Sequence, residues 1–359
     1  MKWPAHGSNP QYLYEAIGMT LPEYYIDFSA NINPLGPPGV LKEKWNDFFH
    51  EINAYPDPNA RRLKAKIAMQ EQLTTESILV GNGGAELITL VARMLKGKKV
   101  LIVQPSFSEY ENACRANGCD ILYYSLREPR YELNLDELRL KLRDVAAVFL
   151  CNPNNPTGVQ FPTSAILSLI AECEKHDCFF ILDEAFYDFL IEYDSFVPYI
   201  GKYQRLIVIR SMTKMFAIPG IRLGYLLASP AIIAELKKLQ PHWSVSTIAL
   251  LTGELCISNA AFINRTQTYI TSERERLFSF YRQQNFFVSP SKVNFYLLKD
   301  PLLEEQFPLF KFLLENGLIP RHTFNFPGLG GRWLRFAIKN RQENNKLMEV
   351  LMQWRQLHP

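Results

Sequence analysis

A lysine among small hydroxyl residues follows one of the apolar runs of this chain. It is Lys214, in Ser211-Met212-Thr213-Lys214, just after the run Leu206–Ile209. An amine at the end of a buried strand loses part of its solvation, which lowers its pKa and makes it a nucleophile. Arg222, eight residues further on, carries the planar guanidinium that binds a phosphate through two hydrogen bonds. Taken alone, a lysine is more often an exposed charge, so this interpretation depends on its surroundings.

A carboxylate stands at the end of a second apolar run. Asp183 directly follows Phe179–Leu182. Ligands of open α/β folds bind at the edge of the sheet where the strands end, and a buried carboxylate there suits a cationic ring nitrogen. The alternatives are a helix N-cap or a metal ligand. Glu184 is the only other potential metal ligand close to Asp183 in the sequence, so we expect no metal site.

Three further strand ends carry groups that suit an anionic, aromatic ligand. The loop Gly81–Gly84 lies between a strand and a helix and offers backbone N–H groups to an anion. The polar segment Asn152–Gly158 follows the apolar run Val145–Leu150, and Phe107, after Val100–Val103, offers a ring for stacking. Each of these segments is also compatible with an ordinary tight turn.

Together the five strand ends match the parts of one cofactor, pyridoxal 5'-phosphate (PLP). They provide for its phosphate, ring nitrogen, ring hydroxyl, ring face and aldehyde. Because the carboxyl ends of parallel strands meet at one edge of a sheet, we expect these groups to converge. The sequence therefore predicts a PLP enzyme whose cofactor is held as a Schiff base on Lys214.

The elements that must position these residues alternate between strand and helix. Apolar positions at helical spacing predict helices near Leu87–Met94, Ser108–Ala116 and Ile166–Cys173. Between them the predicted strands are Ile78–Val80, Val100–Val103, Ile121–Tyr124, Val145–Leu150, Phe179–Leu182 and Leu206–Ile209. This alternation predicts an α/β fold, with a mostly parallel sheet flanked by helices.

The two ends of the chain have a different pattern. We expect a helix near Leu41–Phe49, a long connecting helical region from about Thr247 to Tyr281, and a closing helix whose apolar stripe includes Leu347 and Trp354. Asn294–Leu298 and Trp333–Ile338 resemble strands. The prediction is a large domain over residues 51–245 and a small α+β domain from residues 1–50 and 246–359.

Composition excludes several other classes of protein. The chain has 47% hydrophobic and 21% charged residues, as in ordinary globular proteins. The formal charge is +3 and the basic residues form no cluster, so the charge pattern does not indicate nucleic-acid binding. No signal peptide or membrane-spanning run is evident, and the six cysteines form no C-x-x-C pair. We therefore expect a cytoplasmic protein with free thiols, no metal, and no membrane or nucleic-acid partner.

With these motifs the chain resembles the fold-type I PLP enzymes, the aspartate aminotransferase superfamily, over nearly its whole length. The resemblance implies that Lys214 is the Schiff-base lysine and that Asp183 pairs with the pyridine nitrogen. It also implies that Asn155 bonds the ring hydroxyl and Phe107 stacks on the ring. The implied phosphate ligands are Ser211, Arg222, Gly83, Gly84 and Ala85.

One implied phosphate ligand acts between subunits. Tyr55, in Tyr55-Pro56-Asp57-Pro58, resembles the tyrosine that reaches the cofactor phosphate of the neighbouring subunit. The resemblance therefore implies a homodimer with shared active sites.

Within the superfamily the chain is similar to histidinol-phosphate aminotransferases and more similar to L-threonine-O-3-phosphate decarboxylases. The second resemblance rests on His6-Gly7-Ser8-Asn9, Asp27–Gly36 and Arg210–Tyr225. It also rests on Phe186, where the aminotransferases usually carry a tyrosine that bonds the ring hydroxyl. Ser8 departs from the pattern, since the decarboxylases typically have a second glycine there.

This resemblance implies a reaction and a set of substrate contacts. Arg335 matches the arginine for the substrate carboxylate and Arg321 a substrate-phosphate contact, with His6 and Asn31 as further candidates. Surface salt bridges are the alternative for both arginines. The expected reaction converts L-threonine O-3-phosphate to (R)-1-aminopropan-2-yl phosphate for cobalamin biosynthesis. The alternatives are a histidinol-phosphate type aminotransferase and a non-catalytic PLP-fold regulatory module.

Overall fold

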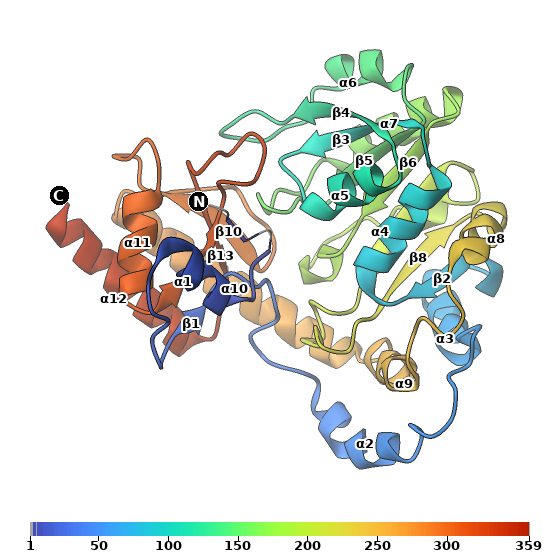
Figure 1. Cartoon of the computed structure of the whole chain (residues 1–359), viewed down its shortest axis with the longest axis horizontal. Helices are drawn as coiled ribbons and strands as arrows, with labels where there is room; N and C mark the ends of the chain where they lie inside the picture. The colour runs from blue at the N-terminus through green and yellow to red at the C-terminus, as the bar shows by residue number, and fades with distance from the viewer. Residues whose placement is uncertain (1–2, 5, 359) are drawn as a thin grey trace.

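A seven-stranded sheet forms the centre of the larger domain in the computed structural model, which describes residues 3–4 and 6–358 (Figure 1). In chain order its strands are β2 (Ile78–Gly81), β3 (Lys99–Gln104), β4 (Asp120–Ser125), β5 (Ala147–Cys151), β6 (Phe179–Asp183), β7 (Leu206–Ser211) and β8 (Gly224–Ala228). Their spatial order is β2-β8-β7-β6-β5-β3-β4. Only β8 runs antiparallel to its neighbours, so the predicted mostly parallel α/β sheet is confirmed.

Helices cover both faces of this sheet. On one face α4 (Gly83–Met94), α5 (Ser108–Ala116) and α8 (Pro230–Leu239) share an apolar cluster with the strands. On the other face lie α6 (Leu135–Leu142) and α7 (Thr163–Lys175). Every residue of β5 is buried, which explains its continuous apolar run, since a strand covered on both faces has no polar side.

The smaller domain combines segments from both ends of the chain, as predicted. Its antiparallel sheet has the order β12-β13-β10-β9. These strands are β9 (Phe287–Val288), β10 (Phe295–Lys299), β12 (Arg321–His322) and β13 (Leu334–Ala337). The N-terminal strand β1 (Ile26–Asp27) pairs in parallel with the C-terminal strand β11 (Leu318–Ile319). The helices here are α1 (Pro10–Ile17), α11 (Phe307–Glu315) and α12 (Arg341–Leu357).

The helical region expected from Thr247 to Tyr281 is divided into two helices. They are α9 (Thr247–Cys256) and α10 (Ala260–Gln283), bent by 74°. The side chain of Asn259 accepts a hydrogen bond from the backbone N–H of Phe262 at 3.1 Å, so a new helix begins there. Within the described part of the chain no single helix is long and apolar enough to cross a membrane, and only this bent pair passes that test, by length and composition.

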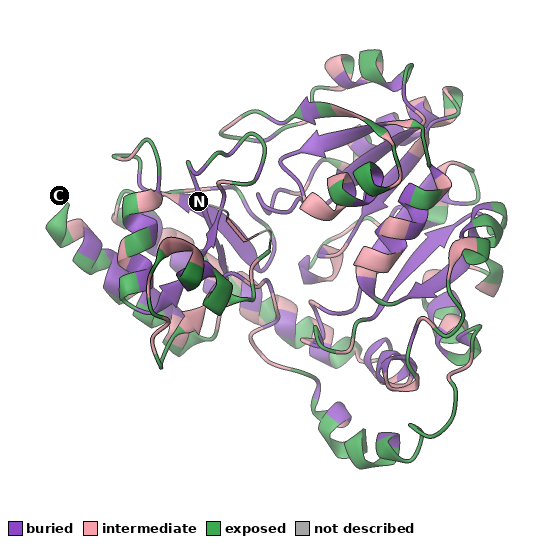
Figure 2. Ribbon diagram, viewed as in Figure 1, coloured by how far each residue is buried: buried purple, intermediate pink, exposed green. Residues whose placement is uncertain are grey.

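Two helices before the large sheet lie on the outside of the molecule. The predicted helix near Leu41–Phe49 is α2 (Gly39–Phe49), which stands away from the rest of the chain in Figure 1. It is followed by α3 (Arg61–Glu71) beside the sheet. Figure 2 shows that most of α2 is exposed. The sequence reasoning did not predict α1, α3, α6, α8, α11 or β8.

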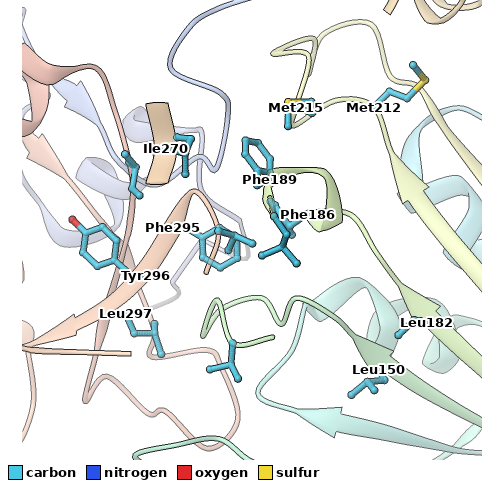
Figure 3. Close-up of a cluster of buried hydrophobic side chains, with 14 of the residues drawn as sticks. Leu150, Leu182, Phe186, Phe189, Met212, Met215, Ile270, Phe295, Tyr296 and Leu297 are labelled. Carbon is cyan, nitrogen blue, oxygen red and sulfur yellow. The ribbon is translucent and has the colours of Figure 1, made fainter. Parts of the chain in front are cut away.

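The two domains share one hydrophobic core. Figure 3 shows Phe186 and Phe189 of the large domain facing Phe295 of the small domain, with Ile270 of α10 nearby. The rings of Phe186 and Phe295 meet edge to face, with centroids 4.7 Å apart. Packing across the junction therefore fixes how the strand ends of the large sheet face the small domain.

Candidate active site

A cavity of about 550 Å³ lies at the junction, where the parallel strands end. This volume is in the usual range for small-molecule sites. The cavity brings together twelve of the predicted site residues. They are His6, Asn31, Gly84, Ala85, Phe107, Asn155, Asp183, Ser211, Lys214, Arg222, Arg321 and Arg335.

Lys214 lies in the loop after β7, and its main chain is held firmly. The backbone N–H of Asn33 donates to the carbonyl of Lys214 at 3.1 Å. The side chain of Asn33 donates to the next carbonyl, that of Met215, at 2.7 Å. Burial, together with the guanidiniums of Arg222 and Arg335, lowers the pKa of Lys214 to about 8. At neutral pH a useful share of this amine is therefore uncharged and nucleophilic.

Asp183 ends β6 and is almost completely buried. Its Oδ2 accepts a hydrogen bond from the hydroxyl of Tyr110 at 2.5 Å, and its Oδ1 accepts one from the backbone N–H of Ala185 at 2.9 Å. Burial raises the pKa of Asp183, while these two hydrogen bonds oppose the rise. A buried carboxylate of this kind is stabilised by a cationic partner.

An anion-binding cup lies at the N-terminus of α4. Gly83 has φ +76°, and a Cβ atom there would lie 2.6 Å from Nη2 of Arg222. Only glycine therefore lets this guanidinium approach the first turn of the helix. The hydroxyls of Ser211 and Thr213 bond each other at 2.8 Å and line the same cavity. Helix N–H groups, hydroxyls and a guanidinium are the donors that a phosphate needs.

Asn155 and Phe107 complete the set expected for the cofactor ring. Oδ1 of Asn155 accepts a hydrogen bond from Arg335 at 2.6 Å, so its Nδ2 group is the donor available to a ring hydroxyl. Phe107, directly before α5, lines the cavity with its half-buried ring. The amine, carboxylate, anion cup, amide and aromatic ring lie around one cavity, and this arrangement fits PLP.

Two arginines of the small domain line the same cavity from adjacent strands. Arg321 of β12 and Arg335 of β13 are direct partners in the antiparallel register. Arg335 is buried and donates to Asn155 and, at 2.6 Å, to the carbonyl of Ser29. Its Nε has no hydrogen-bond partner, and neither has the buried Oδ1 of Asn31. A buried guanidinium with neutral partners and a free donor is ready to bind an anion.

Arg321 is oriented by neutral side chains. It donates to Nε2 of His322 at 2.6 Å and to Oδ1 of Asn325 at 2.8 Å. Burial and the adjacent charge of Arg321 lower the pKa of His322 to about 2. His322 therefore stays neutral and accepts from Arg321, which leaves the positive charge of the guanidinium uncompensated by this contact.

His6, Gly7 and Ser8 near the N-terminus line part of the cavity. His6 pairs with Glu109 of α5 at 2.8 Å, and the backbone N–H of Ser8 donates to Oγ of Ser29 at 2.8 Å. A Cβ atom on Gly7 would lie 2.7 Å from the carbonyl oxygen of Ser29, so the segment packs closely there. This segment places the predicted substrate contact His6 between the two domains.

Comparison with known proteins agrees with this geometry. The family model described as aminotransferase class I and II matches residues 23–351. The chain belongs to this family.

Two relatives and one solved structure show which members of the family are similar. Threonine-phosphate decarboxylase of Salmonella typhimurium is 37% identical over 97% of this chain and 95% of its own length. The adenosylcobalamin biosynthesis bifunctional protein of Leptospira interrogans is 33% identical over 98% of this chain and 41% of its own length. The crystal structure of histidinol-phosphate aminotransferase from Clostridium acetobutylicum has a TM-score of 0.87 and 31% identity, covering 92% and 99% of the two chains.

Two of the predicted cofactor ligands, Gly83 and Tyr55, do not line the cavity of this protein. Gly83 lies just behind it, against Arg222. Tyr55 is 81% exposed, and its ring lies 4.8 Å from that of Trp243. The predicted role of Tyr55 in a neighbouring subunit requires an outward-facing side chain, so that role stays a prediction.

Sequence reasoning missed several residues of the site. Tyr110 and Glu109 follow Phe107 in the first turn of α5. The hydroxyl of Thr213 bonds that of Ser211, and the side chain of Asn33 donates to the carbonyl of Met215. The only signal for Tyr110 was its position three residues after Phe107, which places both side chains on one side of the helix start. Its contact with Asp183 joins residues 73 positions apart and has no local pattern.

Proposed function

We propose that this chain is a PLP-dependent enzyme that decarboxylates L-threonine O-3-phosphate to (R)-1-aminopropan-2-yl phosphate and carbon dioxide. The observation that carries the proposal is the cross-strand pair of buried arginines, Arg321 and Arg335, beside Lys214. Two cationic side chains from adjacent strands in one cavity suit a short substrate with two anionic groups. Threonine phosphate has a carboxylate carbon and a phosphorus four bonds apart on one small skeleton. The 37% identity to a threonine-phosphate decarboxylase supports the same substrate.

The two anions of the substrate are assigned to different guanidiniums. Arg335 has an unpartnered Nε and lies beside Asn155, so it suits the carboxylate. Arg321 lies nearer the N-terminal segment, where Asn325 donates to the carbonyl of Pro4, so it suits the phosphate together with His6. Bound PLP supplies an electron-withdrawing ring into which the electrons of the broken bond can flow.

The residues of the chain then control the carboxylate and the proton. Arg335 orients the carboxylate, and the burial of its side chain keeps this contact away from solvent. Loss of carbon dioxide leaves the substrate carbon in need of one proton. Lys214, with its pKa lowered to about 8, suits the return of that proton from Nζ.

Phe186 favours decarboxylation over transamination. It lines the cavity, is 3% exposed and packs against Phe295. At this position the aminotransferases usually carry a tyrosine whose hydroxyl bonds the ring oxygen. A phenylalanine ring cannot donate that bond, which changes the electronics of the cofactor.

A second candidate is an aminotransferase of the histidinol-phosphate type, favoured by the TM-score of 0.87 to such an enzyme. A non-catalytic module is disfavoured because Lys214 is intact, lies in the cavity and has a lowered pKa. The relative named for adenosylcobalamin biosynthesis supports a role in cobalamin assembly. The proposal includes a cytoplasmic homodimer whose active sites share residues.

An assay of two substrates side by side tests the function. The PLP-loaded protein should release carbon dioxide from L-threonine O-3-phosphate without any 2-oxo acid. It should show little glutamate formation from histidinol phosphate and 2-oxoglutarate. The variant Phe186→Tyr should lower the ratio of decarboxylation to transamination. Rapid turnover of histidinol phosphate, with no carbon dioxide from threonine phosphate, would make the protein an aminotransferase.

A further inference from the structure

We propose that Tyr110 is a positioning residue that keeps the Asp183 carboxylate ionised and aimed at the ring nitrogen of PLP. The inference rests on the PLP cofactor of the proposed function, but not on the identity of the substrate. The Tyr110 hydroxyl donates to Oδ2 of Asp183 at 2.5 Å. The backbone N–H of Ala185 donates to Oδ1 at 2.9 Å, so each oxygen has a protein donor.

The ring of Tyr110 is held so that its hydroxyl reaches Asp183. Tyr110 is 1% exposed. Its ring stacks on that of Phe149 with centroids 5.6 Å apart and 24° between the planes. Phe107 meets the same ring edge to face at 5.9 Å. Because Phe107 is the predicted stacking ring for the cofactor, this arrangement links the contact with the ring face to the contact with the ring nitrogen.

Burial raises the pKa of Asp183, and the hydrogen bond from Tyr110 is the largest contribution against that rise. Burial and the adjacent Glu184 favour the protonated carboxyl. Tyr110, the N–H of Ala185 and the Lys214 ammonium favour the ionised form, and the bond from Tyr110 is the largest of these three. Cys151 of β5 is the residue paired with Asp183 in the sheet, and burial raises the pKa of its thiol, so it adds no charge.

Tyr110 itself does not titrate at physiological pH. Burial, and then the charge of Asp183, raise the pKa of Tyr110 well above its usual value. The phenol therefore remains a donor. A donor to a carboxylate stabilises the ionised form. An ionised Asp183 in turn keeps a proton on the ring nitrogen, which is the state in which PLP withdraws electrons most strongly.

The test replaces Tyr110 by phenylalanine, which keeps the stacked ring and removes only the hydroxyl. Bound PLP labelled with ¹⁵N at its ring nitrogen reports the protonation state by NMR, independently of turnover. The wild-type signal should be that of a protonated nitrogen, and Tyr110→Phe should shift it toward the neutral form. We also expect kcat to fall about 10–100-fold, the loss typical of a hydrogen bond to a charged group, with KM changed far less.

A matched variant separates this role from simple folding. Tyr14 is also 1% exposed and donates its hydroxyl to the carbonyl of Leu314 at 2.7 Å, outside the cavity. Tyr14→Phe should leave the ¹⁵N signal unchanged, even where it lowers stability. Difluorotyrosine at position 110, a stronger donor to Asp183, should keep the ¹⁵N signal in the protonated form or move it further toward that form, and a shift toward the neutral form would contradict the role. This variant also serves if Tyr110→Phe does not fold.

The possible results distinguish failure of the proposed role of Tyr110 from failure of the proposed function. An unchanged ¹⁵N signal and unchanged kcat in Tyr110→Phe would overturn the role of Tyr110. A shifted signal in a protein that does not decarboxylate threonine phosphate would support Tyr110 and reject the substrate. Failure of the wild type to bind PLP would reject both.

Discussion

Lys214 shows how neighbouring charges set the chemistry of a single residue. Two guanidiniums, those of Arg222 and Arg335, and burial lower its pKa to about 8, while Asp183 opposes them. The amine must be neutral to react with an aldehyde. A lysine in water, with a pKa near 10.4, is almost wholly charged at pH 7, whereas a pKa of about 8 leaves roughly one tenth of it neutral.

The pH dependence of cofactor capture follows from this pKa. The folded-state pKa is lowered, so the reactive neutral amine gains population as pH rises and is half of the total at about 8. We expect the rate of PLP capture by the cofactor-free protein to rise with pH through that midpoint and to level off about one to two units above it. Stopped-flow absorbance between pH 6.5 and 10.5 measures it.

One variant checks the cause of the lowered pKa. Arg335→Gln removes one of the two cations that act on Lys214, so its midpoint should move toward higher pH. Lys214→Ala should lose the absorbance of the Schiff base between this lysine and the cofactor. A wild-type midpoint near 10 would show that the surroundings do not activate this amine.

At the scale of elements, the loop after β5 is fixed against the small domain. Gly158 has φ +73°, and a Cβ atom on it would overlap the side chain of Ser291 and lie 2.9 Å from the carbonyl oxygen of Phe295. The backbone N–H of Lys292 donates to the carbonyl of Gly158 at 3.0 Å. The turn that positions Asn155 is therefore shaped by β10 as well as by its own sequence.

A pair of glycine variants tests this packing. Gly97 has φ +70° but nothing within 4 Å of its would-be Cβ. Gly97→Ala should cost only the left-handed strain of about 1–2 kcal/mol. Gly158→Ala adds overpacking and should cost about 2–5 kcal/mol in total. Urea unfolding of both variants measures the difference. Equal losses in the free energy of unfolding would show that the residues around Gly158 move aside at little cost.

At the scale of the whole molecule, several large apolar side chains remain exposed around α2 and the loop before α3. Trp45 and Phe49 of α2 are 52% and 69% exposed, and the paired rings of Tyr55 and Trp243 are 81% and 50% exposed. A cluster of exposed apolar side chains favours a protein interface. This surface supports the proposed dimer, with Tyr55 directed toward a partner.

Mixed dimers test whether Tyr55 acts between subunits. Tyr55→Phe should weaken PLP binding, and Lys214→Ala should be inactive. In a dimer of these two variants, one active site would have Lys214 from one chain and Tyr55 from the other, and would be complete. Remixing after mild unfolding should therefore restore activity above that of either variant alone, up to about half of the wild type. No recovery in confirmed mixed dimers would place Tyr55 outside the partner's site.

The sequence determined which strand ends line the cavity at the edge of the large sheet. Continuous apolar runs identified the buried strands, and the residues that follow them included Lys214, Asp183 and Asn155. This inference succeeded because parallel strands place their carboxyl ends at one edge, so position along the chain predicts position in space. Strand boundaries shifted by only one or two residues, as for β5, whereas helix starts shifted further, by four residues in α4.

Only the tertiary structure decided how the side chains of this framework act on one another. Three features depend on contacts or packing that the periodicity of a local sequence does not reveal. They are the bond from Tyr110 to Asp183, the register of Arg321 with Arg335 and the break before α10. Such contacts join elements far apart in the sequence, and their geometry is set by how the two domains pack. Lys214 is the clearest case: the sequence supplied the amine, and packing beside Arg222 and Arg335 lowered its pKa.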